Sequence, residues 1–191
     1  MATSWVQVCN LALNMLGANS ITSLTQDSKE ARACSRWYEQ ARDEVLESHP
    51  WKCATYRQSL AQLTDVPITD DYDYYYQLPT NPYCLKVRDA PNVPAVVYKI
   101  EGRRLLTNET SIIIRYTKRI TDPTEMDALL TTAIAAKIAE VTSYDITHSG
   151  AVTQAMRALY QDSLMMAIDG DVTGDENPQP DNTSWITAGR S

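Results

Sequence analysis

The stretch YDYYYQLPTNPYCLKV, residues 72–87, decides the fold because it requires β-structure in the middle of a chain that is otherwise helical. Apolar and aromatic residues alternate along both of its halves: Tyr74, Tyr76, Leu78, Tyr83, Leu85 and Val87. Alternation of period two is typical of strands, and the Pro-Thr-Asn-Pro segment at 79–82 is typical of a turn. The pattern predicts two short strands joined by that turn.

A β-meander is expected to follow these strands. The segments 96–100, 105–106 and 112–116 carry alternating or β-branched residues and are separated by turn signals at Gly102 and Asn108. The run of three isoleucines at 112–114 favours a strand buried on both faces. Upstream, residues 53–63 fit either a strand or a loose helix, and the strand is favoured.

Two amphipathic helices precede the β-region. The first covers residues 5–16, with Ser4 placed to cap its start and Gly17 to end it. The second begins after Ser28 and ends near Ser48, because Pro50 disfavours helical geometry at the residue before it.

Two more helices follow the β-region. The segment Asp122-Pro123-Thr124-Glu125 combines a carboxylate cap, a proline at the first helical position and an acid three residues after the cap, so a helix is predicted to begin there. The apolar face expected for that helix comprises Met126, Leu129, Leu130, Ala133, Ile134, Ile138 and Val141. Gly150 separates it from a fourth helix that is expected to end near residue 168 and to pack antiparallel to the third.

The sequence therefore predicts an α+β fold, an antiparallel helical bundle of about four helices with an inserted small antiparallel β domain and an extended C-terminal tail. At 191 residues the chain fits one domain with an embellishment. The expected units are 1–52 for the first half of the helical bundle, 53–120 for the β-rich insert, 121–168 for the second half of the bundle, and 169–191 for the tail.

The tail has a composition that does not favour a packed core. Beyond residue 168 the chain is rich in Asp, Gly, Asn, Pro, Gln and Thr, which bury too little apolar area to offset the entropy of ordering. Trp185 and Ile186 are two large apolar residues in this polar stretch, and Arg190 follows them. We interpret these three as a partner-binding anchor; a loose terminus, or a tail that folds back on its own domain, is the alternative.

Composition excludes several classes of protein. The formal net charge of −7 argues against ordinary nucleic-acid binding, which needs clustered Lys and Arg. No run approaches the ~20 apolar residues of a membrane span, and the chain is expected to fold in a cytoplasm. The four cysteines are scattered and are expected to be buried free thiols, with no pair spaced to hold zinc: Cys9, Cys34, Cys53 and Cys84.

No motif assembles a recognisable active site, so neither a cofactor nor a metal is expected. Residues 169–175 begin like a calcium loop, but position twelve is Pro180, where a glutamate is required. His49 and His148 are each expected at a helix end, where His49 would satisfy terminal carbonyls. Among the acids, Asp43 with Glu44, and Asp70 with Asp71, are adjacent pairs of the kind that glycoside cleavage uses, although 24 acids produce such pairs by chance.

Two pairs of basic residues flank neighbouring predicted strands. Arg103-Arg104 and Lys118-Arg119 could form one basic spot for an acidic partner. Charges that guard solvated strand edges are the favoured interpretation.

Six segments, in this order, resemble the tail tubular protein A family, the head-to-tail adaptors of short-tailed bacteriophages. They are Asn10-x-Ala12-Leu13-x-x-Leu16-Gly17, Arg42-Asp43-x-x-Leu46-x-x-His49-Pro50-Trp51-x-x-Ala54, Tyr76-Gln77-Leu78-Pro79, Ile114-x-Tyr116 before Asp122-Pro123, the Ala-rich third helix, and Trp185-Ile186-x-x-x-Arg190. The likeness spans essentially the whole chain and departs from the family pattern at Asn81-Pro82-Tyr83.

The resemblance implies a structural virion protein and not an enzyme. It implies a ring, expected to be a dodecamer, that docks beneath the portal protein and extends the DNA channel toward the tail nozzle protein and the tail fibres. DNA would pass without specific binding, and the ring would form in the host cytoplasm as part of the virion tail. The tail from residue 169 would reach along the portal. A small cell-wall lytic hydrolase using paired carboxylates is the alternative.

Overall fold

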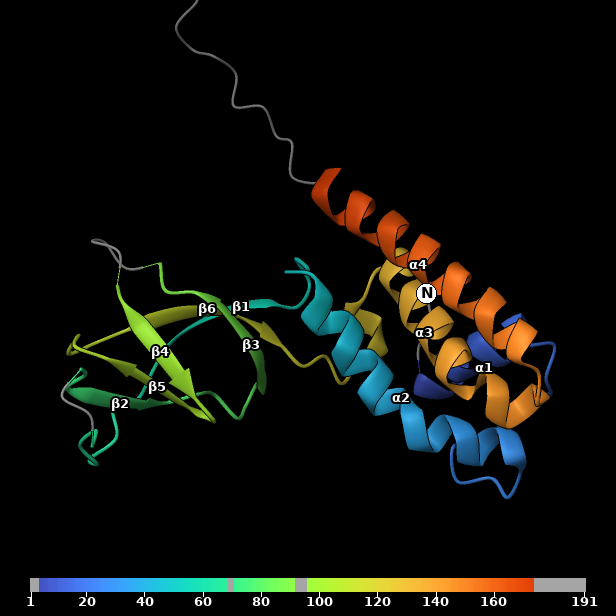
Figure 1. Cartoon of the computed structure of the whole chain (residues 1–191), viewed down its shortest axis with the longest axis horizontal. Coiled ribbons are helices and arrows are strands. Elements are labelled where there is room, and N and C mark those ends of the chain that lie inside the picture. Colours follow the sequence, from blue (N-terminus) through green and yellow to red (C-terminus); the bar gives the residue numbers. More distant parts are fainter. Residues whose placement is uncertain (1–3, 69–70, 92–95, 174–191) are drawn as a thin grey trace, which may run out of the picture.

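The structure is a computed structural model and describes residues 4–68, 71–91 and 96–173. Figure 1 shows a helical bundle on one side and a β domain on the other. The helices are α1 (Trp5–Met15), α2 (Lys29–Ser48), α3 (Ala128–Thr147) and α4 (Gly150–Thr173). The α+β fold with an inserted antiparallel β domain is confirmed.

The first two helices begin and end where their capping residues predict. The Ser4 hydroxyl accepts the Gln7 N–H at 3.3 Å, and the Ser28 hydroxyl accepts the Ala31 N–H at 3.2 Å. Gly17 follows α1 with a φ of 66°, a conformation that glycine adopts at no steric cost.

The third helix begins later than predicted. The Asp122 carboxylate accepts the Thr124 N–H at 2.9 Å, but only the short 3₁₀ helix η1 (Pro123–Glu125) follows it. Met126 is then extended and buried in the core of the bundle, which stops the helix. Asp127 caps α3 instead, accepting the Leu130 N–H at 2.7 Å.

α3 is the central helix of the bundle and packs against the other three. It buries residues around its whole circumference, many of them alanines that let neighbouring helices approach closely: Leu130, Ala133, Ile134, Ala135, Ala136, Ile138 and Ala139. Leu129, which is predicted to face the core, does not: its side chain is 45% exposed.

The fourth helix continues past its predicted end near residue 168, as far as Thr173. Asp171, in its last turn, accepts the Lys52 backbone N–H at 3.2 Å and lies 3.2 Å from the His49 Nε2. These contacts with the segment after α2 explain why a polar, glycine-containing stretch is helical here. The expected extended tail therefore does not begin at 169.

The β domain is two antiparallel three-stranded sheets: one in the order β1-β6-β3 and one in the order β2-β5-β4. The strands are β1 (Thr55–Ser59), β2 (Tyr74–Gln77), β3 (Cys84–Asp89), β4 (Tyr98–Glu101), β5 (Arg104–Thr107) and β6 (Ile113–Lys118). Every predicted strand is present, including the uncertain one at 53–63. The predicted meander is wrong: within the described residues, β4 with β5 is the one pair of strands that are consecutive in the sequence and also hydrogen-bonded to each other.

The turn at 79–82 carries the chain from one sheet to the other and does not fold β3 back onto β2. The two sheets are linked elsewhere, where the Leu63 N–H donates to the Tyr75 carbonyl at 2.8 Å and the Gln77 N–H donates to the Ala61 carbonyl at 3.2 Å. Their facing sides enclose a second core: Leu60, Tyr76, Leu78, Cys84, Leu105, Ile112, Ile114 and Tyr116. Ile113 is 46% exposed, so the prediction that its strand is buried on both faces was wrong.

Candidate functional site

The junction between the bundle and the β domain gathers part of the predicted basic spot. The guanidinium carbons of Arg103 and Arg119 lie 4.2 Å and 4.3 Å from the centre of the Tyr83 ring. Arg104 instead pairs with Asp65, and Lys118 pairs with Glu125. Two of the four predicted residues therefore meet at one point.

Asp43 ties this junction to the helices. Its carboxylate accepts Arg119 Nη2 at 2.6 Å and Arg42 Nε at 2.8 Å, and Arg42 also lies over the Trp5 ring at 5.6 Å. The Arg42 side chain is 5% exposed and that of Asp43 is 19% exposed. A continuous series of contacts therefore joins Trp5 on α1 to Arg42 and Asp43 on α2, and these to Arg119 and Tyr83.

Glu44 points to a different element. Its carboxylate lies 3.1 Å from Lys137 Nζ on α3 and accepts Gln40 Nε2 at 2.9 Å. Burial acts to raise the pKa of Glu44, but the hydrogen bonds from Gln40 and Lys137 outweigh it and leave that pKa below its usual value. A general acid of a glycosidase needs the opposite shift. Asp43 and Glu44 thus do not form such a pair.

The second acidic pair, Asp70 with Asp71, lies partly outside the described residues. Asp70 is not described. The Asp71 backbone carbonyl accepts Asn108 Nδ2 at 3.2 Å, a contact that joins the segment before β2 to the turn after β5.

His49 follows α2, but it does not satisfy the terminal carbonyls of that helix as expected. Arg88 does so, because its Nη2 donates to the carbonyls of Glu47 at 3.1 Å and of His49 at 2.8 Å. His148 ends α3 in a left-handed conformation, with its Nε2 3.0 Å from Lys29 Nζ.

The stretch that begins like a calcium loop is helical as far as Thr173, and the rest of it lies outside the described residues. Within residues 4–68, 71–91 and 96–173, no group of three or more His, Cys, Asp or Glu side chains could hold a metal ion.

All four cysteines are free thiols. Cys9, Cys34 and Cys84 are buried, as predicted, and Cys53 is half-buried. Burial raises the pKa of Cys53 and of Cys84 to about 11. These two thiols are therefore poor nucleophiles near neutral pH.

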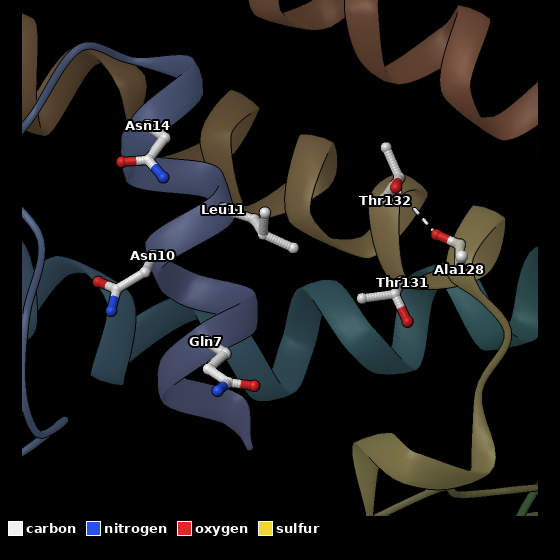
Figure 2. A pocket seen from close by; sticks show the side chains of 7 residues that line it. All are labelled: Gln7, Asn10, Leu11, Asn14, Ala128, Thr131 and Thr132. Atoms are coloured by element: carbon white, nitrogen blue, oxygen red, sulfur yellow. Dashed lines mark hydrogen bonds between the residues drawn. The ribbon is translucent and has the colours of Figure 1, made fainter. Parts of the chain in front are cut away.

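Two of the hollows on the described surface are considered as candidate binding surfaces. The first is a groove of about 500 Å³ between α1 and α3, shown in Figure 2. Leu11 points from α1 toward Thr132 and Ala128 on α3, while the Asn10 amide turns away and holds Ile21 through bonds of 2.8 Å and 2.9 Å. Its lining residues include no titratable group: Gln7, Asn10, Leu11, Asn14, Ala128, Thr131 and Thr132.

The second hollow, the basic cleft, has a volume of about 710 Å³ and lies where the segment after α2 and the last turn of α4 meet strands β1, β3 and β6. Its lining residues are His49, Pro50, Lys52, Thr55, Arg57, Arg88, Arg115, Asp171 and Val172. Four of these side chains are cationic at neutral pH and one is a carboxylate, on a chain whose formal net charge is −7.

The cations of the basic cleft differ in how far they are engaged. Arg88 is fixed by the α2 carbonyls and by the Thr117 hydroxyl at 2.7 Å, and its burial lowers its pKa. Arg115 holds the Asp89 carboxylate through both Nε and Nη2. Arg57 is exposed and has no ion-pair partner among the described residues. Only strand pairing brings Arg57, Arg88 and Arg115 together, so sequence patterns could not single them out.

The predicted anchor residues Trp185, Ile186 and Arg190 lie outside the described residues. Neither models of known protein families nor the curated proteins include a match to this chain. No helix within the described residues is both long and apolar enough to cross a membrane.

Proposed function

We propose that this chain is a structural subunit of a short-tailed phage virion, an adaptor ring that joins the portal protein to the tail nozzle and extends the DNA channel. The observation that supports the proposal most is the element order: two helices, an inserted β domain and two further helices. That is the order on which the resemblance to the tail tubular protein A family rests.

The character of the molecular surface also supports a role in assembly. Large apolar side chains stand in solvent along the second half of α4, where Met165 is 66% exposed, Met166 is 65% exposed and Val172 is 58% exposed. Exposed apolar residues in such a group favour contact with another protein surface. The groove between α1 and α3 offers a second surface, in which Leu11 and Ala128 lie among the uncharged polar side chains of Gln7, Asn10, Asn14, Thr131 and Thr132. In the proposed ring these faces meet neighbouring copies and the portal.

A truncation at the C-terminus tests the proposed tail contact. The cut belongs after Thr173, because removal of Asp171 would also remove its contacts with His49 and the Lys52 N–H. The chain shortened to residues 1–173 is expected to keep its helical content and its melting temperature and to lose affinity for the portal protein, measured by biolayer interferometry. Trp185→Ala should reproduce most of the loss, and Thr183→Ala, in the same polar stretch, should not. Portal affinity that survives truncation contradicts the tail assignment.

A further inference from the structure

We infer that the basic cleft is a docking site for an acidic, extended peptide segment of a partner protein. The inference does not rest on the adaptor role, because the chemistry of the cleft is independent of what the whole molecule does. The cleft gathers Lys52, Arg57, Arg88 and Arg115 from one loop and three strands. Among them Arg57 is exposed and has no ion-pair partner in the described part of the chain, so it is the cation that a carboxylate from outside can engage.

Carboxylates already occupy the margins of the basic cleft. The Asp171 side chain, 7% exposed, is held by the Lys52 N–H at 3.2 Å and lies 3.2 Å from His49 Nε2. The Asp89 carboxylate receives two hydrogen bonds from Arg115. Paired N–H donors of this kind match the geometry of a carboxylate. Arg57, which also lines the cleft, remains exposed.

Size and charge favour a peptide over other anions. A hollow of about 710 Å³ takes a few residues of an extended chain and is too small for a folded domain or a nucleic-acid duplex. Nucleic acid carries one charge per phosphate, and an acidic protein repels such a polymer over the Debye length. A short segment with a few carboxylates meets much less repulsion and can still engage Arg57.

Fluorescence anisotropy with a labelled peptide of alternating glutamate and aspartate tests this site on the full-length protein. We expect binding at low salt that weakens as salt is added, and Arg57→Glu should weaken it at least about tenfold. Arg57→Lys should retain most of it. The matched control is Arg32→Glu, the same charge change at an exposed residue whose side chain is 63% exposed at the other end of α2; it should leave binding unchanged within about twofold.

Melting temperatures check that the three variants are folded. We expect them to match that of the natural chain, because Arg57 and Arg32 are both exposed. Equal losses for Arg57→Glu and Arg32→Glu would mean that net charge, and not the cleft, attracts the peptide, which overturns the inference. Tighter binding of a single-stranded oligothymidylate would assign the cleft to nucleic acid instead. Absence of peptide binding at low salt would also overturn the inference that the cleft binds an acidic peptide.

Discussion

Asp43 lies on α2 and accepts hydrogen bonds from Arg42 of the same helix and from Arg119, which follows β6. Replacement by Asn leaves the buried Arg42 charge without its counter-ion. We expect Asp43→Asn to lower the free energy of unfolding by about 2 kcal/mol, less than the ~3–5 kcal/mol of a fully buried pair because Asp43 is partly exposed. Urea denaturation measures the difference.

Asp27 supplies the matched control for this substitution. It pairs with Arg32, but its own side chain is 96% exposed. Asp27→Asn should change stability by less than about 0.5 kcal/mol. Equal effects of the two substitutions would show that the contacts of Asp43 do not hold the junction together.

The cysteines make a second prediction at the scale of single residues. Iodoacetamide near pH 8 should modify the native protein slowly, because burial raises the pKa of Cys53 and of Cys84 to about 11 and also shields Cys9 and Cys34. Denaturant should expose all four thiols to rapid modification, counted by mass spectrometry. Rapid labelling of Cys84 in the native protein would contradict the burial of that thiol in the β domain.

Among the elements, α3 is capped by Asp127, whereas the sequence pattern predicts Asp122 as the cap. Asp122 with Pro123 has the stronger local signature, yet Asp127 makes the hydrogen bond to the helix, because the burial of Met126 requires extended backbone between the two. Asp127→Ala should cost about 1 kcal/mol of unfolding free energy. Asp122→Ala should cost clearly less. A larger loss of unfolding free energy for Asp122→Ala than for Asp127→Ala would place the start of the helix at Pro123.

The contact between α2 and α3 gives a prediction about pH. The pKa of the Glu44 carboxyl lies below its usual value, so its stabilising effect is complete above the usual pKa and is lost as the pH falls through the lowered one. Between about pH 7 and about pH 3.5, Glu44→Gln should therefore lose less stability than the natural chain. The measurement is urea denaturation at both pH values; identical pH dependence would show that the pair with Lys137 has no effect.

At the scale of the whole molecule, local signals predict the elements but not their partners. Ser4, Gly17 and Ser28 fix the ends of helices through contacts within a few residues, and those ends are correct. The period of two at 72–87 reveals strands, but it carries no information on which strand pairs with which, so a meander was predicted where two sheets exist.

Distant contacts also explain what patterns could not reveal in the candidate site. The last turn of α4 depends on Asp171 meeting His49 and Lys52, residues far away in the sequence. The basic cleft depends on the pairing of β1 and β3 with β6, which places Arg57, Arg88 and Arg115 around one hollow. Arg103 and Arg119 of the predicted basic spot do meet, but they meet over the Tyr83 ring, because the strands that they flank, β5 and β6, lie in different sheets.

Negative-stain electron microscopy of the full-length chain mixed with its portal protein tests most directly the central claim, that this protein acts by assembly. The proposal predicts a ring of copies seated on the portal with a continuous axial channel, and no ring on a portal incubated with an unrelated acidic protein of similar size. A portal that stays bare while the chain remains a single particle would contradict it.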